Sequence, residues 1–262
     1  MEKDLIHTLL LVDDNEDILD FLSDDLGDKY HVLTAANGKD ALEILARESV
    51  HLVISDVMMP GMDGFELCGM IKSSVESSHI PVILLTARNT LQSKIEGLEQ
   101  GADAYVEKPF SPEFLHVQIS SLLKNRDKVK AYFASSPLLH LKSMAHTRAD
   151  ELFLEKLQQI IHSNISNPDL DVEHLADNMH MSRPTFYRKI KAISDLSPNE
   201  LINLARLKKA VELLNEGVLK IYEVAEMVGY NSQTQLGRNF LKQFGMSPTD
   251  YISSLQADKR KS

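Results

Sequence analysis

Four short apolar runs in the first half of the chain each lead into a polar residue that can serve phosphate chemistry. In chain order, the runs and the residues that follow them are 9–12 with Asp13 and Asp14, 52–55 with Asp56, 82–85 with Thr86, and 104–107 with Lys108. Short apolar runs between helical stretches are typical of buried parallel strands. In an open α/β sheet, ligands bind at the carboxyl ends of the strands. The pattern therefore predicts that three carboxylates, a hydroxyl and an ammonium meet at one edge of a sheet.

The chemistry that suits this set of groups is phosphoryl transfer to a carboxylate. Asp56 is the best acceptor, since a carboxylate can act as a nucleophile and a loop with Pro60 and Gly61 follows it in an open turn. Mg²⁺ prefers oxygen ligands, so Asp13 and Asp14 are predicted to carry this metal beside Asp56, with the backbone carbonyl of Met58. The metal, Lys108 and Thr86 would share the neutralisation of the phosphoryl oxygens.

A simpler interpretation exists for each of these residues taken alone. An aspartate after a strand is more often a helix cap or a turn former, and Asp13 or Asp14 could begin the helix that follows. A threonine or a lysine at a strand end is also common. The chemical interpretation is favoured because every member falls at a predicted strand end, in the order that the site requires.

Residues 7–124 resemble a response-regulator receiver domain. The matching motifs are Val12–Asn15, Asp56–Gly64, Leu85–Ala87, Gly101–Tyr105 and Lys108–Phe110. The resemblance implies an α/β fold with a doubly wound, five-stranded parallel sheet in the order 2-1-3-4-5 and five helices. It also implies phosphorylation of Asp56, Mg²⁺ at Asp13 and Asp14, a switch built from Thr86 and Tyr105, and a cis bond between Lys108 and Pro109.

Length and charge divide the chain into two parts. The 262 residues suggest two domains of ordinary size. Residues 1–120 contain 8 Lys and Arg against 22 Asp and Glu, a net charge of −14, whereas residues 121–262 contain 20 against 16, a net charge of +4. This contrast fits a regulatory module joined to an anion-binding module.

The cysteine count and the hydropathy pattern favour a cytoplasmic location. The single cysteine, Cys68, excludes an intramolecular disulfide, fits a reducing compartment, and is predicted to be a small core residue. No apolar run approaches the roughly 18 residues of a membrane span, and the N-terminus lacks the pattern of a secretion signal. We expect no membrane contact by this segment.

The joint between the two parts is predicted at residues 125–149, as a linker that can be partly helical. The last helix of the first domain should begin near Ser111–Glu113 and be followed by the basic stretch 124–130, before Ser136 and Pro137 interrupt any continuing helix. The predicted domains are a receiver over residues 1–124, a linker over 125–149, and an all-α domain over 150–262. The basic stretch is either a solvated face or a contact to DNA phosphates.

Residues 182–202 and 232–252 form a repeat with a constant offset of 50. In each copy a short helix, a tight turn and a serine, Ser182 or Ser232, precede a second helix, which is the helix-turn-helix plan. Between the copies, apolar residues at helical spacing end at Gly217 and predict a long connecting helix. In this plan the second helix of each copy enters the major groove of DNA, and we call these two helices the reading helices. The spacer would hold them in successive major grooves, about 34 Å apart.

Residues 150–255 resemble the AraC-type DNA-binding domain, most clearly over Val224–Tyr230 and Phe240–Pro248. The candidates for DNA contact are Arg183, Thr185, Tyr187, Arg188, Gln233, Thr234, Gln235 and Arg238 on early turns of the reading helices, with Lys189, Lys191 and Lys242 as phosphate contacts. Solvated helix faces are the alternative for each of them. Pro184 and Gly237 depart from a regular helix, and Gly237 either allows close approach to DNA or softens its helix. Phe186, Ile190, Leu236 and Phe240 are predicted to be core residues and not platforms for base stacking.

The sequence therefore predicts a transcription factor controlled by phosphorylation. Its expected partners are a histidine kinase, separate or on the same polypeptide, and double-stranded DNA, and we expect a homodimer on activation. The order of the domains also resembles the cytoplasmic end of a hybrid two-component sensor. An aspartyl-phosphate phosphatase is disfavoured because Met58 stands where that chemistry needs a second aspartate. A protein-interaction module with an inactive helix-turn-helix is the third alternative.

Overall fold

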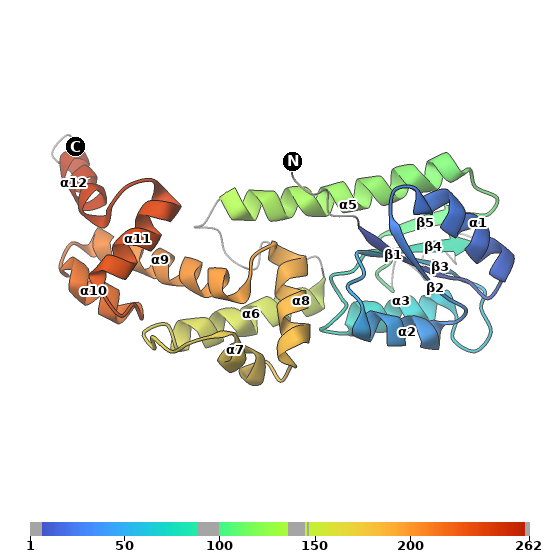
Figure 1. Cartoon of the computed structure of the whole chain (residues 1–262), viewed down its shortest axis with the longest axis horizontal. Coiled ribbons are helices and arrows are strands. Elements are labelled where there is room, and N and C mark those ends of the chain that lie inside the picture. The colour runs from blue at the N-terminus through green and yellow to red at the C-terminus, as the bar shows by residue number, and fades with distance from the viewer. Residues whose placement is uncertain (1–6, 88–99, 136–144, 146, 260–262) are drawn as a thin grey trace. The chain divides into compact units, whose positions relative to one another are not determined.

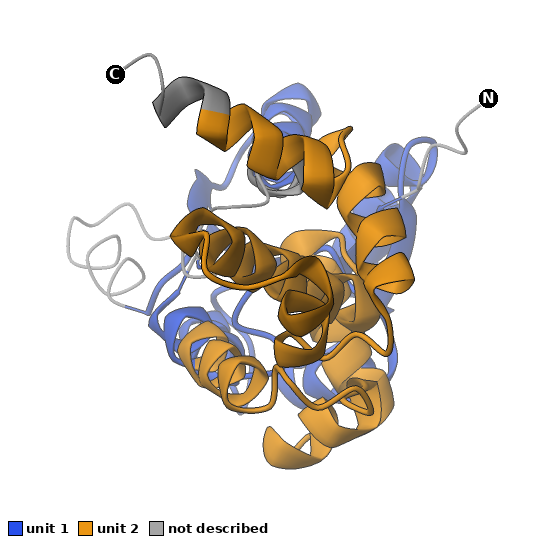
Figure 2. Ribbon diagram, turned by 90° about the vertical axis from the view of Figure 1, so that its left-hand side faces the viewer, with its two compact units in different colours: residues 1–132, 144–152 blue, residues 133–143, 153–262 orange. Residues whose placement is uncertain are grey.

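The computed structural model describes residues 7–87, 100–135, 145 and 147–259 (Figure 1). The chain forms two compact units, which Figure 2 distinguishes by colour. One contains residues 1–132 and 144–152, and the other contains residues 133–143 and 153–262. Each unit has its own hydrophobic core, and each is described in turn.

The first unit is built on a five-stranded parallel sheet. The strands are β1 (Thr8–Val12), β2 (His31–Ala35), β3 (Leu52–Asp56), β4 (Val82–Thr86) and β5 (Ala104–Glu107), in the order β2-β1-β3-β4-β5. The predicted sheet and its order are confirmed. β3 and β4 are buried along their whole length, as expected for strands that are covered on both faces and are therefore apolar throughout.

Helices cover both faces of this sheet. The helices of this unit are α1 (Glu16–Gly27), α2 (Gly38–Arg47), α3 (Gly64–Ser73) and α5 (Pro112–Ser135). Leu9 and Leu11 point into a cluster with α1 and α5, whereas Leu10 and Val12 point into a cluster with α2 and α3. This follows from the alternation of side chains along a strand. The resemblance also implies a helix between β4 and β5, and residues 88–99 lie outside the described part of the chain.

Polar side chains at the helix starts leave the strand-end acids available for other roles. Asn15 caps α1, with its side chain accepting a hydrogen bond from the Asp17 amide at 2.9 Å. Asp63 caps α3 in the same way, accepting from the Glu66 amide at 2.8 Å. Since Asn15 fills the capping position of α1, neither Asp13 nor Asp14 caps that helix.

A polar network lies at the opposite, amino-terminal ends of β4 and β5. Asp103 accepts hydrogen bonds from Lys72 at 2.5 Å and from the Val82 amide at 2.8 Å, and Arg126 lies 3.7 Å away. Burial lowers the pKa of Arg126, and the neighbouring Asp103 and Asp150 oppose that shift. The network ties α3 and α5 to the sheet at a distance from the strand ends where ligands bind.

The last helix of the first unit extends beyond the predicted domain boundary and into the predicted linker. It begins where expected, with Ser111 Oγ accepting from the Phe114 amide at 3.2 Å, but α5 continues to Ser135, beyond the predicted boundary at residue 124. No glycine or proline occurs between Pro112 and Pro137, so no residue ends the helix earlier. Residues 125–135 of the predicted linker are therefore helical, and residues 136–144 and 146 lie outside the described part.

The second unit is entirely helical in the residues described. Its helices are α6 (Arg148–Ser163), which begins in the first unit, α7 (Val172–Asn178), α8 (Arg183–Ser194), α9 (Pro198–Glu216), α10 (Ile221–Met227), α11 (Gln233–Phe244) and α12 (Pro248–Lys259). The repeat is visible in these bounds, because α8 and α11 begin and end 50 residues apart and α9 and α12 begin 50 residues apart. The long connecting helix is α9, and Gly217 ends it at φ 71° as predicted.

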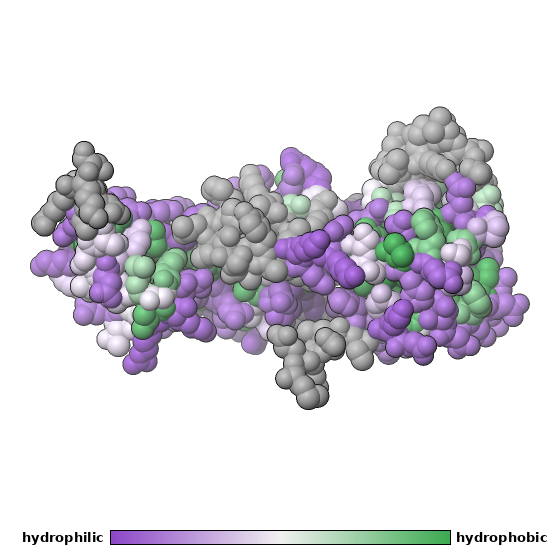
Figure 3. Space-filling view, turned by 90° about the horizontal axis from the view of Figure 1, so that it is seen from above, coloured by the Kyte–Doolittle hydropathy of each residue, from purple (hydrophilic) through white to green (hydrophobic). Residues whose placement is uncertain are grey.

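The core of this unit is apolar. Phe186, Ile190, Leu236 and Phe240 are each no more than 1 % exposed, which confirms them as core residues. On the face in Figure 3, apolar side chains are interspersed with hydrophilic ones over the described residues. None of the described helices is both long enough and apolar enough to span a bilayer.

Candidate functional site

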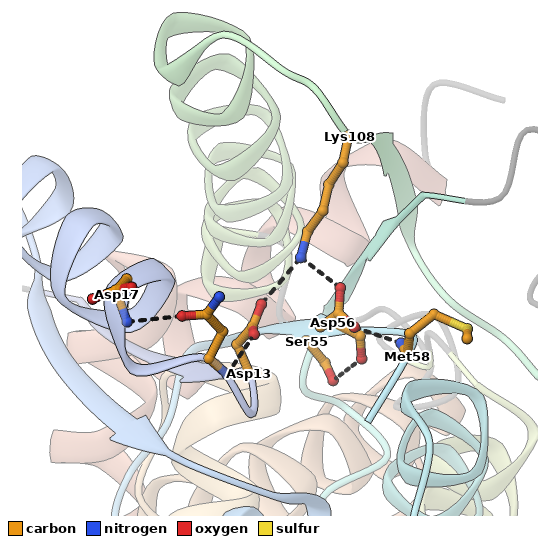
Figure 4. A network of polar contacts seen from close by, with 7 residues as sticks. Asp13, Asp17, Ser55, Asp56, Met58 and Lys108 are labelled. Atoms are coloured by element: carbon orange, nitrogen blue, oxygen red, sulfur yellow. Dashed lines mark hydrogen bonds and ion pairs between the residues drawn. The ribbon is translucent and has the colours of Figure 1, made fainter. Parts of the chain in front are cut away.

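Two acids and one lysine meet at the carboxyl end of the sheet. Asp56 is the last residue of β3, Asp13 follows the adjacent β1, and both are buried, at 6 % and 3 % exposed. Lys108 follows β5, and its Nζ lies 2.6 Å from Asp56 Oδ1 and 3.1 Å from Asp13 Oδ2 (Figure 4). The lysine therefore joins two carboxylates that come from adjacent strands, as the sequence pattern predicted.

Backbone amides fix the orientation of both carboxylates. The Met58 amide donates to Asp56 Oδ2 at 2.5 Å, so each Asp56 oxygen has one donor, an ammonium or an amide (Figure 4). The Asn15 amide donates to Asp13 Oδ1 at 3.0 Å. Donors that are fixed before reaction hold the nucleophile in one orientation and need no reorganisation when charge develops on the group that it attacks.

The two residues of the predicted switch lie on β4 and β5. Thr86 is the last residue of β4 and is 1 % exposed, and its carbonyl accepts from the Lys108 amide at 2.8 Å. Tyr105 is partly buried on β5, with its ring centroid 6.3 Å from that of Phe65. The bond between Lys108 and Pro109 is cis, as the resemblance implied. The switch itself stays a prediction.

Asp14 lies apart from the buried pair. Its side chain is exposed, and the described residues include no group of three or more His, Cys, Asp and Glu placed to hold a metal. The donor set nonetheless suits Mg²⁺, because Asp13 and Asp56 already gather around one cation and carboxylate oxygens are ligands that Mg²⁺ prefers. The magnesium site at Asp13, Asp14, Asp56 and the Met58 carbonyl stays a proposal.

The charge of Lys108 is stabilised by its two partners. Burial lowers the pKa of this ammonium, but hydrogen bonds from it to Asp56 and Asp13 raise the pKa by more, so the net shift is upward. A folded pKa above the unfolded value means that the stabilisation is complete below the ordinary lysine pKa of about 10.4 and is lost as the pH rises through the folded pKa.

Lys108→Met is expected to lower the free energy of unfolding by about 1–2 kcal/mol at neutral pH, because two carboxylates lose a shared donor that is partly open to solvent. Urea unfolding at several pH values between about 7 and 11 should show this difference shrinking above about pH 10.4, because the lysine of the unfolded chain then releases a proton that the folded chain still holds. The exposed Lys39→Met is the control and should change little. A difference for Lys108→Met that stays constant to the highest pH would contradict the assignment.

The predicted DNA-contacting residues lie on α8 and α11 with accessible side chains. Residues that are exposed are Arg183, Tyr187, Lys191, Gln233, Thr234, Gln235, Arg238 and Lys242, and Thr185 and Arg188 are partly buried. Local contacts engage some of them, since Gln235 Oε1 accepts from the Asn231 amide at 3.1 Å and Lys191 lies 3.2 Å from Asp195 Oδ1. Their contacts with DNA stay predictions.

Lys189 was predicted as a phosphate contact, and that prediction is wrong. Its side chain is 1 % exposed, and its ammonium lies 5.4 Å from the centroid of the Phe153 ring. Lys189 follows Phe186 by three residues and precedes Ile193 by four, so it lies on the buried face of α8. The assumption that a lysine points to water failed because a ring lies close enough to interact with the charge.

The two irregular residues of the reading helices have different consequences. Pro184 lies in the first turn of α8, where its missing N–H costs no helical hydrogen bond. A Cβ at Gly237 in α11 would meet nothing within 4 Å. Packing within the described chain therefore gives no reason for this glycine, and both predicted alternatives, close approach to DNA and a softened helix, stay open.

Comparisons with known proteins agree with both halves of this description. Residues 9–120 match the family model of the response regulator receiver domain, and residues 175–254 match that of a helix-turn-helix domain. The chain is 38% identical over 244 residues to histidine kinase P4 of Formosa agariphila, a match that covers 93% of this chain and 18% of that protein. It is 44% identical over 121 residues to the uncharacterized transcriptional regulatory protein YrkP of Bacillus subtilis, covering 46% of this chain and 51% of that protein.

Among solved structures, chemotaxis protein CheY4 of Vibrio cholerae is 34% identical and covers 45% of this chain and 99% of that chain, with a TM-score of 0.44. The sheet and the acidic site define a receiver domain. Residues 9–120 are a receiver domain of the response-regulator family, and a helix-turn-helix domain of the AraC type follows over residues 175–254. It spans less than two thirds of the curated relatives named above.

Proposed function

We propose that the protein accepts a phosphoryl group on Asp56 from a histidine kinase and that this modification controls DNA binding by α8 and α11. The observation that carries the proposal is the contact of Lys108 with both Asp56 and Asp13. A lone aspartate at a strand end has many uses, but here an ammonium beside the buried carboxylate places positive charge where the oxygens of an incoming phosphoryl group would lie.

In the proposed reaction, the bond between phosphorus and the kinase histidine breaks as a bond forms between phosphorus and an Asp56 oxygen. The other ring nitrogen of the histidine carries a proton taken from solvent, so the ring leaves as neutral imidazole. The Lys108 ammonium and the Thr86 hydroxyl then neutralise charge on the phosphoryl oxygens. Mg²⁺, held by Asp13, Asp14, Asp56 and the Met58 carbonyl, would supply further positive charge at the same place. The chain is then a regulator and not an enzyme acting on a separate substrate.

The proposed output is a homodimer that binds tandem DNA sites. A shift of a conformational equilibrium from 1:99 to 99:1 needs about 5.5 kcal/mol of differential stabilisation. A single phosphoryl group with a few charge-assisted hydrogen bonds supplies less than that, so dimerisation and DNA binding contribute the remainder. Thr86 would contact the phosphoryl group and Tyr105 would turn inward, and the surface formed by β5 and α5 would change as a result.

The test is sequence-selective DNA binding by the full chain before and after treatment with acetyl phosphate and Mg²⁺. DNA sites are first selected from a random duplex library, and affinities are then measured over a range of salt concentrations. We expect affinity to fall steeply with salt, as phosphate contacts require, and to rise after treatment. A protein that selects no sequence, or whose affinity ignores acetyl phosphate, would refute the proposal.

A second candidate is that this chain is the regulator portion of a longer hybrid sensor in which the kinase lies on the same polypeptide. The favouring observation is that the similarity to histidine kinase P4 of Formosa agariphila runs through both halves of this chain. Sequencing the genomic region upstream of Met1 decides between the two arrangements. An open reading frame that continues upstream in frame into a kinase supports the longer protein.

A further inference from the structure

Arg206 lies on α9 and is only 8 % exposed although it carries a charge. Its Nη2 donates to the carbonyl oxygen of Asn167 at 2.6 Å, and its guanidinium carbon lies 5.7 Å from the centroid of the Tyr230 ring. Asn167 belongs to the loop that leads into α7, the first helix of the first helix-turn-helix. Tyr230 belongs to the turn between α10 and α11, in the second helix-turn-helix. One guanidinium therefore contacts the loop that leads into the first module and the turn of the second.

The backbones of the two modules also meet beside Arg206. Gly229 has φ +77°, and a Cβ on it would lie 2.3 Å from the Ile165 carbonyl oxygen and 3.0 Å from Arg206 Nη2. Only glycine allows this approach, because a side chain would be strained by the dihedral angle and would overlap a backbone oxygen. The turn of the second module is thus pressed against the loop of the first.

Tyr230 holds this joint on its other side. Its hydroxyl donates to Asn203 Oδ1 at 2.7 Å, one turn before Arg206 on α9. Burial raises the pKa of Tyr230 to about 12, and the nearby charge of Arg206 opposes that shift. The tyrosine is therefore a neutral donor at physiological pH, and the joint includes the Arg206 cation, the Tyr230 ring and the Asn203 amide.

The buried charge of Arg206 costs free energy of folding, so a gain in stability does not explain why an arginine stands here. Burial lowers the pKa of Arg206, which shows that its charge is poorly compensated, and in the described part of the chain its Nε has no hydrogen-bond partner. Apolar residues of similar volume often stabilise such a position as well or better than a buried charge. A planar group with several donors can instead fix geometry, because each donor has a direction.

We infer that Arg206 is a positioning residue that fixes the separation of α8 and α11, and thereby the spacing between the two DNA segments that one chain can bind at once. This inference rests on the proposed function, since it requires DNA binding by both modules. Two reading helices held at a fixed separation fit only one spacing between the two DNA segments. Base pairs inserted between these segments shift the second one along the duplex axis and rotate it about that axis relative to the first.

The test uses the full chain and a duplex selected by the wild-type protein from a random library. One or two base pairs are then inserted between the two segments of this duplex that the reading helices contact, which are located by nuclease footprinting. We expect the wild type to lose about tenfold or more in affinity on insertion. Arg206→Met should bind the original duplex more weakly and lose less than about threefold on insertion, because its second module can follow the displaced segment.

Controls separate this role from a loss of folding. Arg206→Lys keeps a charge beside Tyr230 but not the planar donor set, so it should fold and still tolerate the insertion better than the wild type. Lys209→Met removes a cation of the same helix, one that pairs with Glu212 at 3.0 Å, and should keep the wild-type spacing profile. Circular dichroism checks that each variant is helical.

The outcomes distinguish the inference from the function on which it rests. If the wild type selects no sequence, both fail. If the wild type binds selectively but tolerates insertions, the function stands and the inference fails. If Arg206→Met and Arg206→Lys are folded and weaker yet show the wild-type ratio between spacings, Arg206 only stabilises the domain and the inference is likewise wrong.

Discussion

Asp56→Asn is expected to abolish phosphorylation of the protein by acetyl phosphate. The asparagine amide cannot act as the nucleophile, whereas its oxygen can still accept a hydrogen bond from the Met58 amide or from Lys108. The variant should therefore keep the fold of the first unit while losing the reaction. Gel electrophoresis that separates phosphorylated from unphosphorylated protein measures the effect, and circular dichroism checks the fold.

Asp63→Asn is the matched control for this loss. Asp63 lies on the loop that follows Asp56, but its carboxylate caps α3 by accepting from the Glu66 amide. Asparagine caps helices about as well as aspartate, so this variant should be phosphorylated as the wild type is. Undiminished labelling of Asp56→Asn, or loss of labelling in both variants, would show that the acceptor lies elsewhere.

The receiver fold could be predicted because its signals are local and redundant. Each strand of the sheet is marked by a short apolar run, and each chemically useful residue comes at or just after the end of one. The contact between Lys108 and Asp56 joins residues 52 positions apart. It was nonetheless predictable, because parallel strands with their polar residues at the same end bring those residues to one edge.

The surroundings of individual side chains could not be predicted in the same way. Lys189 was assigned to the surface from its charge, yet its helical position places it on the core side of α8 beside Phe153. Arg206 carried no signal that separates it from other basic residues of α9. In both cases the deciding fact is which residue of another helix lies opposite, and that depends on packing and not on local pattern.

The two copies of the repeat have positive backbone φ at matching places although their residue types differ. His180 and Gly229 have positive φ at the turn of each helix-turn-helix, and Asp195 and Gly245 have positive φ after each reading helix. The first pair is 49 residues apart and the second pair 50, so the turn of the second copy is one residue longer. Identical residue types were not needed, because aspartate and, less often, histidine also adopt this conformation.

Gly64→Ala should be the most disruptive small substitution in the first unit. A Cβ at this position would lie 2.2 Å from the carbonyl oxygen of Asp56 and 2.9 Å from Val57 Cα. Both atoms belong to the backbone at the end of β3, so no side chain can rotate away, and either the start of α3 or the acceptor itself must move. We expect a loss of about 1–3 kcal/mol in the free energy of unfolding, the range for added atoms in a packed site.

The rate of phosphorylation should fall as well, because the displaced group is the acceptor. A shift of about 1 Å can cost on the order of a hundredfold in rate when reacting atoms must be aligned. Labelling by acetyl phosphate and urea unfolding are therefore measured on the same variant.

Two other glycines give graded controls for this effect. A Cβ at Gly27 would meet nothing within 4 Å, and one at Gly38 would meet only the side chain of Met62, at 2.6 Å. Gly27→Ala should leave stability and labelling unchanged or slightly raise stability, since alanine restricts the unfolded chain. Gly38→Ala should cost less than Gly64→Ala because the flexible Met62 can move. If all three variants behaved alike, the close approach of α3 to the Asp56 backbone would not be what constrains residue 64.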